Sequence, residues 1–464
     1  MKAWQYISKL TEEAIPVVLS EEEQTWDAAD EIERQTDALL KLQWSSNVPG
    51  SGAPESVIIA AVQSMESMGY DVSSVEEILP EGLAALKNND TQKLQAITAR
   101  VFKMLYDCPI DKSSDYWNYK VYESFDEYAE GLSFPKTAEK LSPEVFQDLT
   151  RAGWIGRLCG GALGTGIEGY TTNQLTKKFG EIRDYVRKPN TYNDDITYEI
   201  AFLKACQLVD KIPSSSDIAE QWVALVPSGW SAEQVALDNI KRGIFPPESG
   251  KFRNAYREWI GAQMRGAICG QVAPGDAYTA AKLAWADAEI SHHGNGILGE
   301  VFNAVLVSLS YGATDMKSVL KQSIELIPED SEYSSVIRFA WEQCESGKSF
   351  SEAWAACEEK YNKYNWIHAY PNAAAEVVSL YFGEGDFDET MYYISTCGQD
   401  VDCNAAQIAV AIGAMNGTSC IADKWSKPIG DIVQTYMRGM KEIKLDTLVE
   451  WTVQVSNMIE ADCK

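Results

Sequence analysis

The hydrophobic positions of this chain recur at helical spacing over long stretches. Segments 144–164, 198–212, 277–290, 300–313 and 405–417 carry apolar residues three and four positions apart and are longer than typical strands. Alternating β-branched runs bounded by turn residues are scarce. The pattern predicts an all-α protein, with further helices expected in the apolar-periodic stretches 55–70 and 91–107.

Two of the expected helices carry small residues along one face. The residues, spaced three or four apart, are Gly153, Gly156, Gly160 and Gly164 in the first helix and Ala406, Ala409, Gly413 and Gly417 in the second. A glycine inside a helix costs about 1 kcal/mol relative to alanine, so such a stripe needs compensation, usually the close approach of another backbone. We therefore expect these two helices to be central and to pack against each other.

A domain boundary is expected between residues 130 and 147, where Pro135 and Pro143 interrupt the helical pattern. It divides the chain into a helical N-terminal region, residues 1–140, and a domain rich in glycine and alanine, residues 141–464. The N-terminal region offers no cluster of reactive side chains, so the chemistry is expected in the second part.

Charge and composition narrow the classes of function. The chain has 68 acidic and 40 basic residues, a net charge of −28, and no basic patch, which argues against binding to nucleic acid or to anionic membranes. No stretch approaches the roughly 18 apolar residues that span a bilayer, and the first residues lack the pattern of a secretory signal. The ten cysteines form no C-x-x-C pair. These features predict reduced thiols and a cytoplasmic location.

Acidic residues stand at the edges of three expected helices. Glu168 follows the first glycine-rich helix, Asp194 and Asp195 are adjacent at the start of another, and Asp400 and Asp402 precede the second small-residue helix. Each group has an ordinary explanation as well, since an aspartate can cap a helix N-terminus and Glu168 can be a plain loop glutamate. If the helices converge, the five acids cluster in one cavity and supply the oxygen ligands that Mg²⁺ or Mn²⁺ takes.

The motifs "WIGRLCGGALGTGIEG", "YNDDITYE" and "GQDVDCNAAQIAVAIGAMNG", in this order and spacing, resemble the ADP-ribosylglycohydrolase superfamily. The resemblance covers about residues 150–420 and is greatest to a bacterial branch with an extra N-terminal region. It implies an orthogonally packed, multi-helix all-α core around a cleft with one or two divalent ions, Mg²⁺ or Mn²⁺. In such enzymes the ions contact the ribose hydroxyls of an ADP-ribosyl group and a bound water.

The resemblance also implies the metal ligands. Asp194 and Asp195 match the acids of the family's T-D-D motif, and Asp400 and Asp402 match those of its D-x-D-T motif. Where the family often has threonine, this chain has Asn193 and Cys403; an amide oxygen suits a hard cation, whereas a thiol is a poor ligand for Mg²⁺. The expected metal ligands are Asn193, Asp194, Asp195, Asp400, Asp402 and Cys403.

Glu168 matches the glutamate that closes the family's first glycine-rich helix, and the resemblance implies a catalytic set of Glu168, Asp195 and Asp402, with Glu168 as acid or base. Cleavage at a ribose C1 builds positive charge on the ring, which a carboxylate cluster stabilises. The expected function is a divalent-metal-dependent glycohydrolase acting on an N- or O-ribosidic ADP-ribosyl linkage, on a protein or a small acceptor. Two alternatives stay open: a metal-dependent hydrolase of another riboside or furanoside, and a non-catalytic relative that binds ADP-ribose.

Four further residues are expected to contact the substrate. His292 matches a histidine-containing block of the family and is expected to line the pocket with Asp287 and Asn295, although a helix-end histidine held by backbone contacts is an equal alternative. Gly164, at the end of the first glycine-rich helix, completes the set. Segment 370–374, "YPNAA", is expected to form a loop. The sequence leaves the oligomeric state open.

Overall fold

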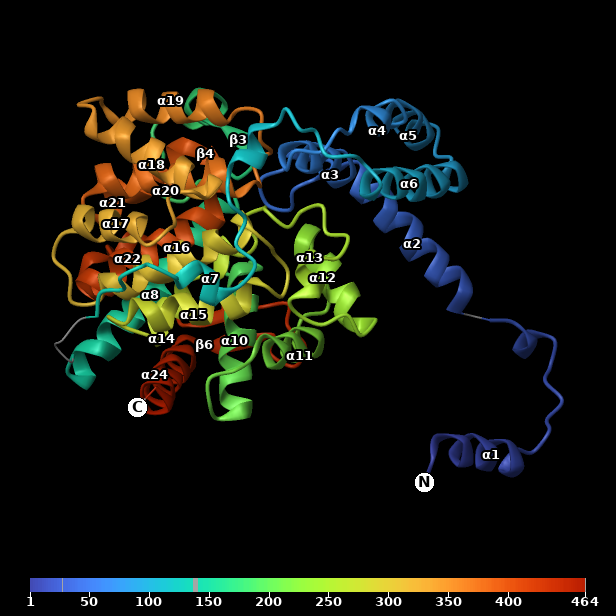
Figure 1. Cartoon of the computed structure of the whole chain (residues 1–464). Coiled ribbons are helices and arrows are strands. Elements are labelled where there is room, and N and C mark those ends of the chain that lie inside the picture. The colour runs from blue at the N-terminus through green and yellow to red at the C-terminus, as the bar shows by residue number, and fades with distance from the viewer. Residues whose placement is uncertain (27, 137–140, 464) are drawn as a thin grey trace.

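The computed structural model describes residues 1–26, 28–136 and 141–463, and these residues form a predominantly α-helical protein (Figure 1). The N-terminal region contains α1 (Ala3–Glu13), α2 (Ala28–Trp44), α3 (Val57–Ser67), α4 (Ser73–Glu76), α5 (Leu79–Lys87), α6 (Thr91–Tyr106) and α7 (Phe125–Ala129). The all-α fold expected from the helical periodicity is confirmed.

The rest of the described chain forms the main body. Its helices are α8 (Pro143–Gly164), α9 (Thr172–Phe179), α10 (Asp195–Val209), α11 (Ser215–Leu225), α12 (Ser231–Lys241), α13 (Glu248–Lys251), α14 (Ala267–Val272), α15 (Ala277–Ala288), α16 (Asn295–Ser310), α17 (Met316–Glu325), α18 (Glu332–Glu345), α19 (Phe350–Tyr361), α20 (Ala369–Gly383), α21 (Phe387–Cys397), α22 (Val401–Asn416), α23 (Asp423–Ile429) and α24 (Leu445–Asp462). None of the helices described is both long and apolar enough for a bilayer crossing.

Short strands pair in three places in the described part of the chain, each time antiparallel. The pairs are β1 (Ser46–Asn47) with β2 (Pro54–Glu55), β3 (Tyr170–Thr171) with β4 (Gly398–Gln399), and β5 (Ile432–Gln434) with β6 (Glu442–Lys444). In the second pair Tyr170 lies opposite Gln399. This register places the turn after α8 beside the turn before α22.

The two small-residue helices, α8 and α22, pack backbone to backbone, as their spacing predicted. A Cβ at Gly160 would lie 2.4 Å from the carbonyl carbon of Ala405, and one at Gly413 would lie 2.6 Å from that of Ala152. Only hydrogen fits at these positions, so the close approach accounts for glycine there. Gly417 differs from the prediction, because it follows α22 as its C-cap, with a φ of 74°.

The expected domain boundary at residue 140 lies outside the described residues, so the division into two domains stays a prediction. The first helix of the main body, α8, begins just after that gap. Its N-cap, Ser142, accepts a hydrogen bond from the Val145 N–H at 3.3 Å. Pro143 occupies the first turn, where a missing N–H is tolerated.

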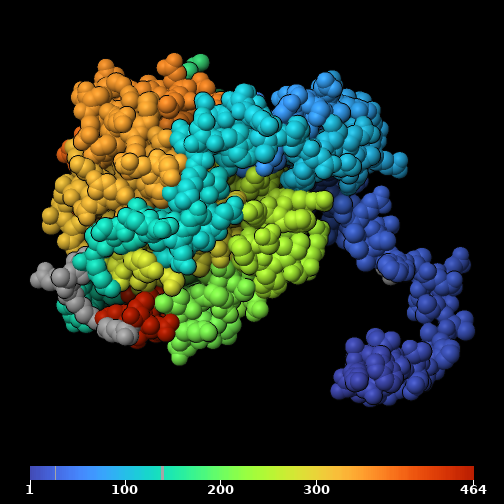
Figure 2. Space-filling view, viewed as in Figure 1, coloured from blue at the N-terminus to red at the C-terminus, as the bar shows by residue number. Residues whose placement is uncertain are grey.

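The N-terminal region packs against the main body through α3, which is largely buried. The Ser64 hydroxyl donates to the Ala255 carbonyl at 2.7 Å, and the Tyr256 hydroxyl donates to the Val57 carbonyl at 3.1 Å. By contrast, α1 has no buried residue and stands apart from the body (Figures 1 and 2). The N-terminal region therefore contacts the main body through residues that follow α1.

Segment 370–374 is helical, and the expectation of a loop there was wrong. These residues form the first turns of α20, whose N-cap His368 accepts the Tyr370 N–H on Nδ1 at 3.3 Å. Pro371 lies close enough to the helix start for its missing N–H to cost no intrahelical bond. The correction matters because Asn372 in this segment contacts the acidic site.

Candidate active site

Three acid-bearing segments meet at the C-terminal end of α8. Glu168 lies in the turn that follows this helix, and its N–H donates to the Gly164 carbonyl at 2.9 Å. Asp400 is the N-cap of α22 and Asp402 lies in its first turn. Asp194 is the N-cap of α10, which begins at Asp195. The positive ends of two helix dipoles thus point at the acids and favour negative charge there.

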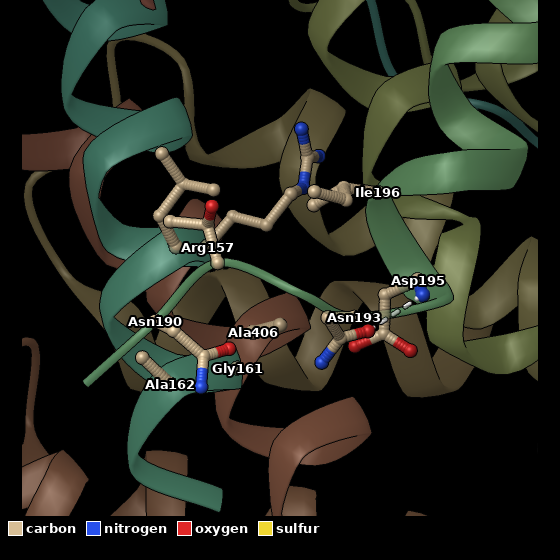
Figure 3. A pocket seen from close by; sticks show the side chains of 10 residues that line it. Arg157, Gly161, Ala162, Asn190, Asn193, Asp195, Ile196 and Ala406 are labelled. Atoms are coloured by element: carbon tan, nitrogen blue, oxygen red, sulfur yellow. Dashed lines mark hydrogen bonds between the residues drawn. The ribbon is translucent and has the colours of Figure 1, made fainter. Parts of the chain in front are cut away.

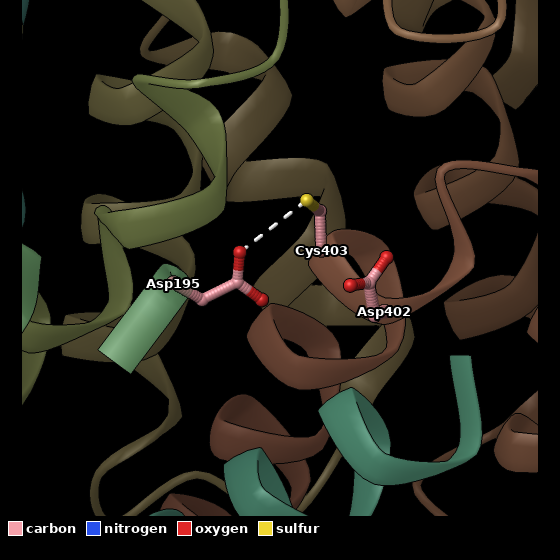
Figure 4. A group of neighbouring side chains, drawn as sticks. All are labelled: Asp195, Asp402 and Cys403. Carbon is pink, nitrogen blue, oxygen red and sulfur yellow. Dashed lines mark hydrogen bonds between the residues drawn. The ribbon is translucent and has the colours of Figure 1, made fainter. Parts of the chain in front are cut away.

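Direct contacts join the NDD and DVD segments. The Asn193 amide Nδ2 donates to Asp402 Oδ2 at 3.2 Å, while its Oδ1 accepts the backbone N–H of Asp195 at 2.7 Å (Figure 3). The Cys403 thiol donates to Asp195 Oδ1 at 3.3 Å (Figure 4). Segments 208 and 209 residues apart at these two bonds are therefore in hydrogen-bonding contact, with Asn193 and Cys403 as the links.

Two groups of side chains in the described chain have the spacing of a cation site. One contains Asp195, Asp402 and Cys403, the other Glu168, Asp400 and Asp402, and in each group the ligand atoms lie within 4.8 Å of one another. Asp402 belongs to both groups. Asp194 belongs to neither, although it lies next to Asp195. The arrangement offers adjacent positions for one or two ions that share the Asp402 carboxylate.

Several oxygens of this cluster have no hydrogen-bond partner, namely Asp195 Oδ2, Asp400 Oδ1 and Asp402 Oδ1. The three side chains are buried, with Asp195 at 0% and the other two at 4% exposure. Neither Asp194 nor Asp400 uses its side chain to cap its helix, so capping does not account for the acids. Buried polar atoms without a partner are rare, and hard divalent cations in the two groups would satisfy these oxygens.

Burial and mutual repulsion make the cluster hard to ionise. Burial, followed by the charges of the neighbouring aspartates, raises the pKa of Glu168, Asp195 and Asp400 well above the usual range of a carboxyl group. Burial, with the charge of Asp402, raises the pKa of Asp194 to about 6. A bound cation would reverse the repulsion, which is a second way in which the residues fit a metal ion.

An asparagine that the sequence did not single out supports the DVD turn. Asn372 Oδ1 accepts the Asp400 N–H at 3.0 Å and the Asn404 side-chain amide at 2.7 Å. The only sequence signal for this contact was Asn404, which lies in the D-V-D-C-N-A block. Asn372 was missed because its segment was expected to be a loop.

A buried ion pair behind Asp195 was also missed. Arg157 of α8 lies in a small pocket with Asn193 and Asp195 (Figure 3), and its Nε lies 2.7 Å from Glu199 Oε2. Both side chains are fully buried. Glu199 lies one helical turn after Asp195 on α10, so the pair fixes α10 against α8 close to the acids. Burial raises the pKa of Glu199 to about 8, and the charge of Arg157 opposes that rise.

Of the predicted substrate residues, Asp287 and His292 lie in a buried network around Arg265. Arg265 Nε lies 2.5 Å from Asp287 Oδ1, and Arg265 Nη2 donates to Ser291 Oγ at 3.0 Å. Ser291 Oγ lies 2.7 Å from His292 Nδ1. Burial, with the charge of Arg265, lowers the pKa of His292 well below its usual value, so this imidazole is neutral.

Asn295 and Gly164 have different surroundings. Asn295 Nδ2 donates to Glu258 Oε1 at 3.1 Å, and Asn295 Oδ1 accepts the Tyr333 N–H at 3.0 Å. Gly164 abuts the acidic site, because a Cβ there would lie 2.0 Å from the Asp402 nitrogen. The structure thus brings Gly164 to the acids and holds Asp287, His292 and Asn295 in protein contacts. A contact of these four residues with substrate stays a prediction.

Comparisons with known proteins show similarity in sequence and in fold. The family model for ADP-ribosylglycohydrolase matches residues 142–457. An uncharacterized protein of Archaeoglobus fulgidus is 25% identical over 295 residues, which cover 60% of this chain and 90% of that protein. A solved structure described as an ADP-ribosylglycohydrolase-related protein complex covers 68% of this chain and 99% of its own, with a TM-score of 0.51 and 18% identity. The last similarity supports the fold.

Proposed function

Because the chain belongs to the ADP-ribosylglycohydrolase family, we propose that it is a divalent-metal-dependent hydrolase of an N- or O-ribosidic ADP-ribosyl linkage. Membership of the family supports a glycohydrolase-like function acting on ADP-ribosylated substrates in general. One observation carries the finer proposal: acids from three distant segments meet in one buried cluster whose oxygens are partly unpartnered. The acceptor is a protein side chain or a small molecule.

The proposed ion is Mg²⁺ or Mn²⁺, held by carboxylates of Asp195, Asp400 and Asp402, with Asp194 and the loop residue Glu168 beside them. These are oxygen donors on short side chains, the ligands that hard cations prefer. When bound, the ion would hold the ribose diol in one pose and lower the pKa of a bound water. Asn193 and Cys403, proposed as ligands from the sequence, also act through the hydrogen bonds that they donate to Asp402 and Asp195.

The protein's own residues supply the rest of the proposed chemistry. Glu168 lies beside Asp400 and Asp402 and is the proposed group that transfers a proton at the scissile C1 bond. Asp195 and Asp402 place negative charge near the ribose ring, where positive charge develops as the bond breaks. The burial of all three carboxyl groups excludes bulk water, which strengthens their electrostatic effect.

The test uses the full chain with Mg²⁺ or Mn²⁺ and a panel of ADP-ribosylated peptides, ADP-ribosylated amino acids and simple aryl ribosides. Release of ADP-ribose that requires the cation, and that disappears in Asp402→Asn while circular dichroism stays unchanged, supports the proposal. Turnover of aryl ribosides alone would favour another riboside as substrate. Thermal stabilisation by ADP-ribose without turnover of any substrate would make the protein a binder.

A further inference from the structure

One segment of the N-terminal region reaches the site described above. Residues 46–56, which we call the strap, form a small hairpin in which β1 pairs with β2. The Val48 N–H donates to the Ala53 carbonyl at 2.8 Å, and the Asn47 side-chain amide donates to the Gly52 carbonyl at 2.9 Å. The tip is therefore held by its own hydrogen bonds, and in sequence it lies about 90 residues before α8.

The strap lies against the loop that carries Glu168. Arg187 joins the two, because its Nη1 donates to the Gly50 carbonyl at 3.0 Å and its Nη2 donates to the Thr165 carbonyl at 3.2 Å. The Tyr170 hydroxyl donates to the Ser51 carbonyl at 3.1 Å. Thr165 and Tyr170 stand on either side of Glu168 in sequence, so the strap is fixed to both ends of its loop.

The fit between strap and loop leaves no room for side chains. A Cβ at Gly50 would lie 2.4 Å from the Thr165 carbonyl oxygen, and a Cβ at Gly169 would lie 2.6 Å from Ala53 Cβ. Both glycines also have a positive φ, +111° and +77°, which favours glycine. Ala53 is completely buried. The strap is thus a tightly fitted wall rather than a loosely lying loop.

The far end of the strap is attached to a different segment of the main body. The Trp230 Nε1–H donates to Glu55 Oε1 at 3.1 Å, and the Ser46 hydroxyl donates to Glu55 Oε2 at 3.3 Å. Trp230 is the N-cap of α12. The strap therefore bridges the Glu168 loop and the start of α12, two parts of the family domain that lie about 60 residues apart in sequence.

We propose that the strap is a specificity-determining wall on the acceptor side of the site, and that it favours small acceptors over the surface of a folded protein. The inference rests on the proposed function, in which Glu168 transfers a proton at the bond between ribose C1 and the acceptor. Because the strap packs against the loop that carries Glu168, it would border the acceptor group bound at that bond. The hydrogen bond from Trp230 to Glu55 makes Glu55 the residue that fixes the α12 end of this wall.

The experiment compares two substrates with the same linkage, an ADP-ribosylated amino acid and a folded protein that carries the same modification. The arginine-linked and the serine-linked pair are both assayed, and kcat and KM are measured for each substrate. Glu55→Ala and Trp230→Phe each remove the link to α12. Glu55→Gln keeps the acceptor oxygen for Trp230. Glu66→Ala, at an exposed position of the neighbouring helix α3, is the matched control.

In Glu55→Ala and Trp230→Phe, kcat/KM for the folded protein relative to the amino acid rises about tenfold, the scale of one lost hydrogen bond to a charged group. Glu55→Gln and Glu66→Ala keep the wild-type ratio. Equal changes for both substrates, with Mn²⁺ binding and thermal unfolding as for wild type, overturn the strap inference alone. A wild-type protein inactive on both substrates overturns the proposed function and the inference together.

Discussion

Gly164 offers a sharp test of how the helix packing holds the acidic site. In Gly164→Ala the new Cβ would lie 2.0 Å from the nitrogen and 2.1 Å from the Cα of Asp402. Ordinary van der Waals contact begins at 3.4 Å, so Asp402 has to move away by roughly 1.4 Å, the difference between these distances. Backbone atoms cannot rotate away as a side chain can. The carboxylate shared by both acid groups is therefore displaced.

The expected magnitudes separate packing from metal binding. Protein ligands to a metal tolerate shifts of only about 0.2 Å, so Gly164→Ala should lower Mn²⁺ affinity by at least about 10–100-fold, as loss of supporting contacts does. Gly156→Ala is the matched control, because its Cβ would lie 2.7 Å from the Ala409 carbonyl oxygen in the same helix pair but away from the acids. Overpacking costs about 1–3 kcal/mol, offset in part by about 1 kcal/mol of helix propensity.

Isothermal titration calorimetry with Mn²⁺ and chemical denaturation without metal measure the two effects. Gly156→Ala is expected to lose stability and keep its Mn²⁺ affinity, whereas Gly164→Ala loses both. Wild-type Mn²⁺ affinity in Gly164→Ala would refute the reasoning that this contact positions Asp402. An equal loss of affinity in both variants would show that helix spacing in general, and not the contact at Asp402, controls the site.

Three further predictions address single groups. Cys403→Ser keeps a hydrogen-bond donor to Asp195 and removes the soft sulfur. Calorimetry should therefore show weaker binding of Cd²⁺ and tighter binding of Mg²⁺. Unchanged affinity for both ions would place the sulfur outside the coordination sphere. At pH 9, above the Glu199 pKa of about 8, Arg157→Met leaves the Glu199 charge without its partner and should cost about 3–5 kcal/mol in the free energy of unfolding. A second change, Glu199→Gln, restores part of this loss, and a smaller loss in the single variant than in the double would contradict the pairing. Burial raises the pKa of Glu376 to about 8 from 4.5, so its contribution to stability is present below pH 4.5 and is lost as the pH rises through 8. Denaturation from pH 5 to 9 should therefore show wild type losing stability relative to Glu376→Gln, and parallel profiles would contradict the shift.

The fold was predictable where one physical cause explained a pattern. The stripes on α8 and α22 had few explanations other than close backbone approach, and the structure shows that approach at Gly160 and Gly413. The meeting of the NDD and DVD segments followed from the ends of the helices that carry them. The interior glycines indicated their compensation, whereas the cation expected to compensate the adjacent acids stays a prediction.

Other contacts could not be predicted from the amino-acid sequence of a single chain. Arg157 and Glu199 are 42 positions apart, and nothing in either segment marks the other as its partner. The strands β3 and β4 have two residues each, too few for any alternation. In segment 370–374 a proline favoured a loop, whereas the structure places Pro371 near the helix start, where proline is tolerated. For the same reason Asn372 was not predicted as a site residue.

The central claim is that acids from the NDD and DVD segments hold a hard cation in common. Anomalous diffraction from crystals of the full chain soaked in Mn²⁺ tests it directly. The account predicts a manganese peak within coordinating distance of carboxylate oxygens of Asp195 and Asp402, and none in crystals of Asp402→Asn. A well-ordered acidic cluster without a peak at millimolar Mn²⁺, or a peak bound only elsewhere, would contradict it.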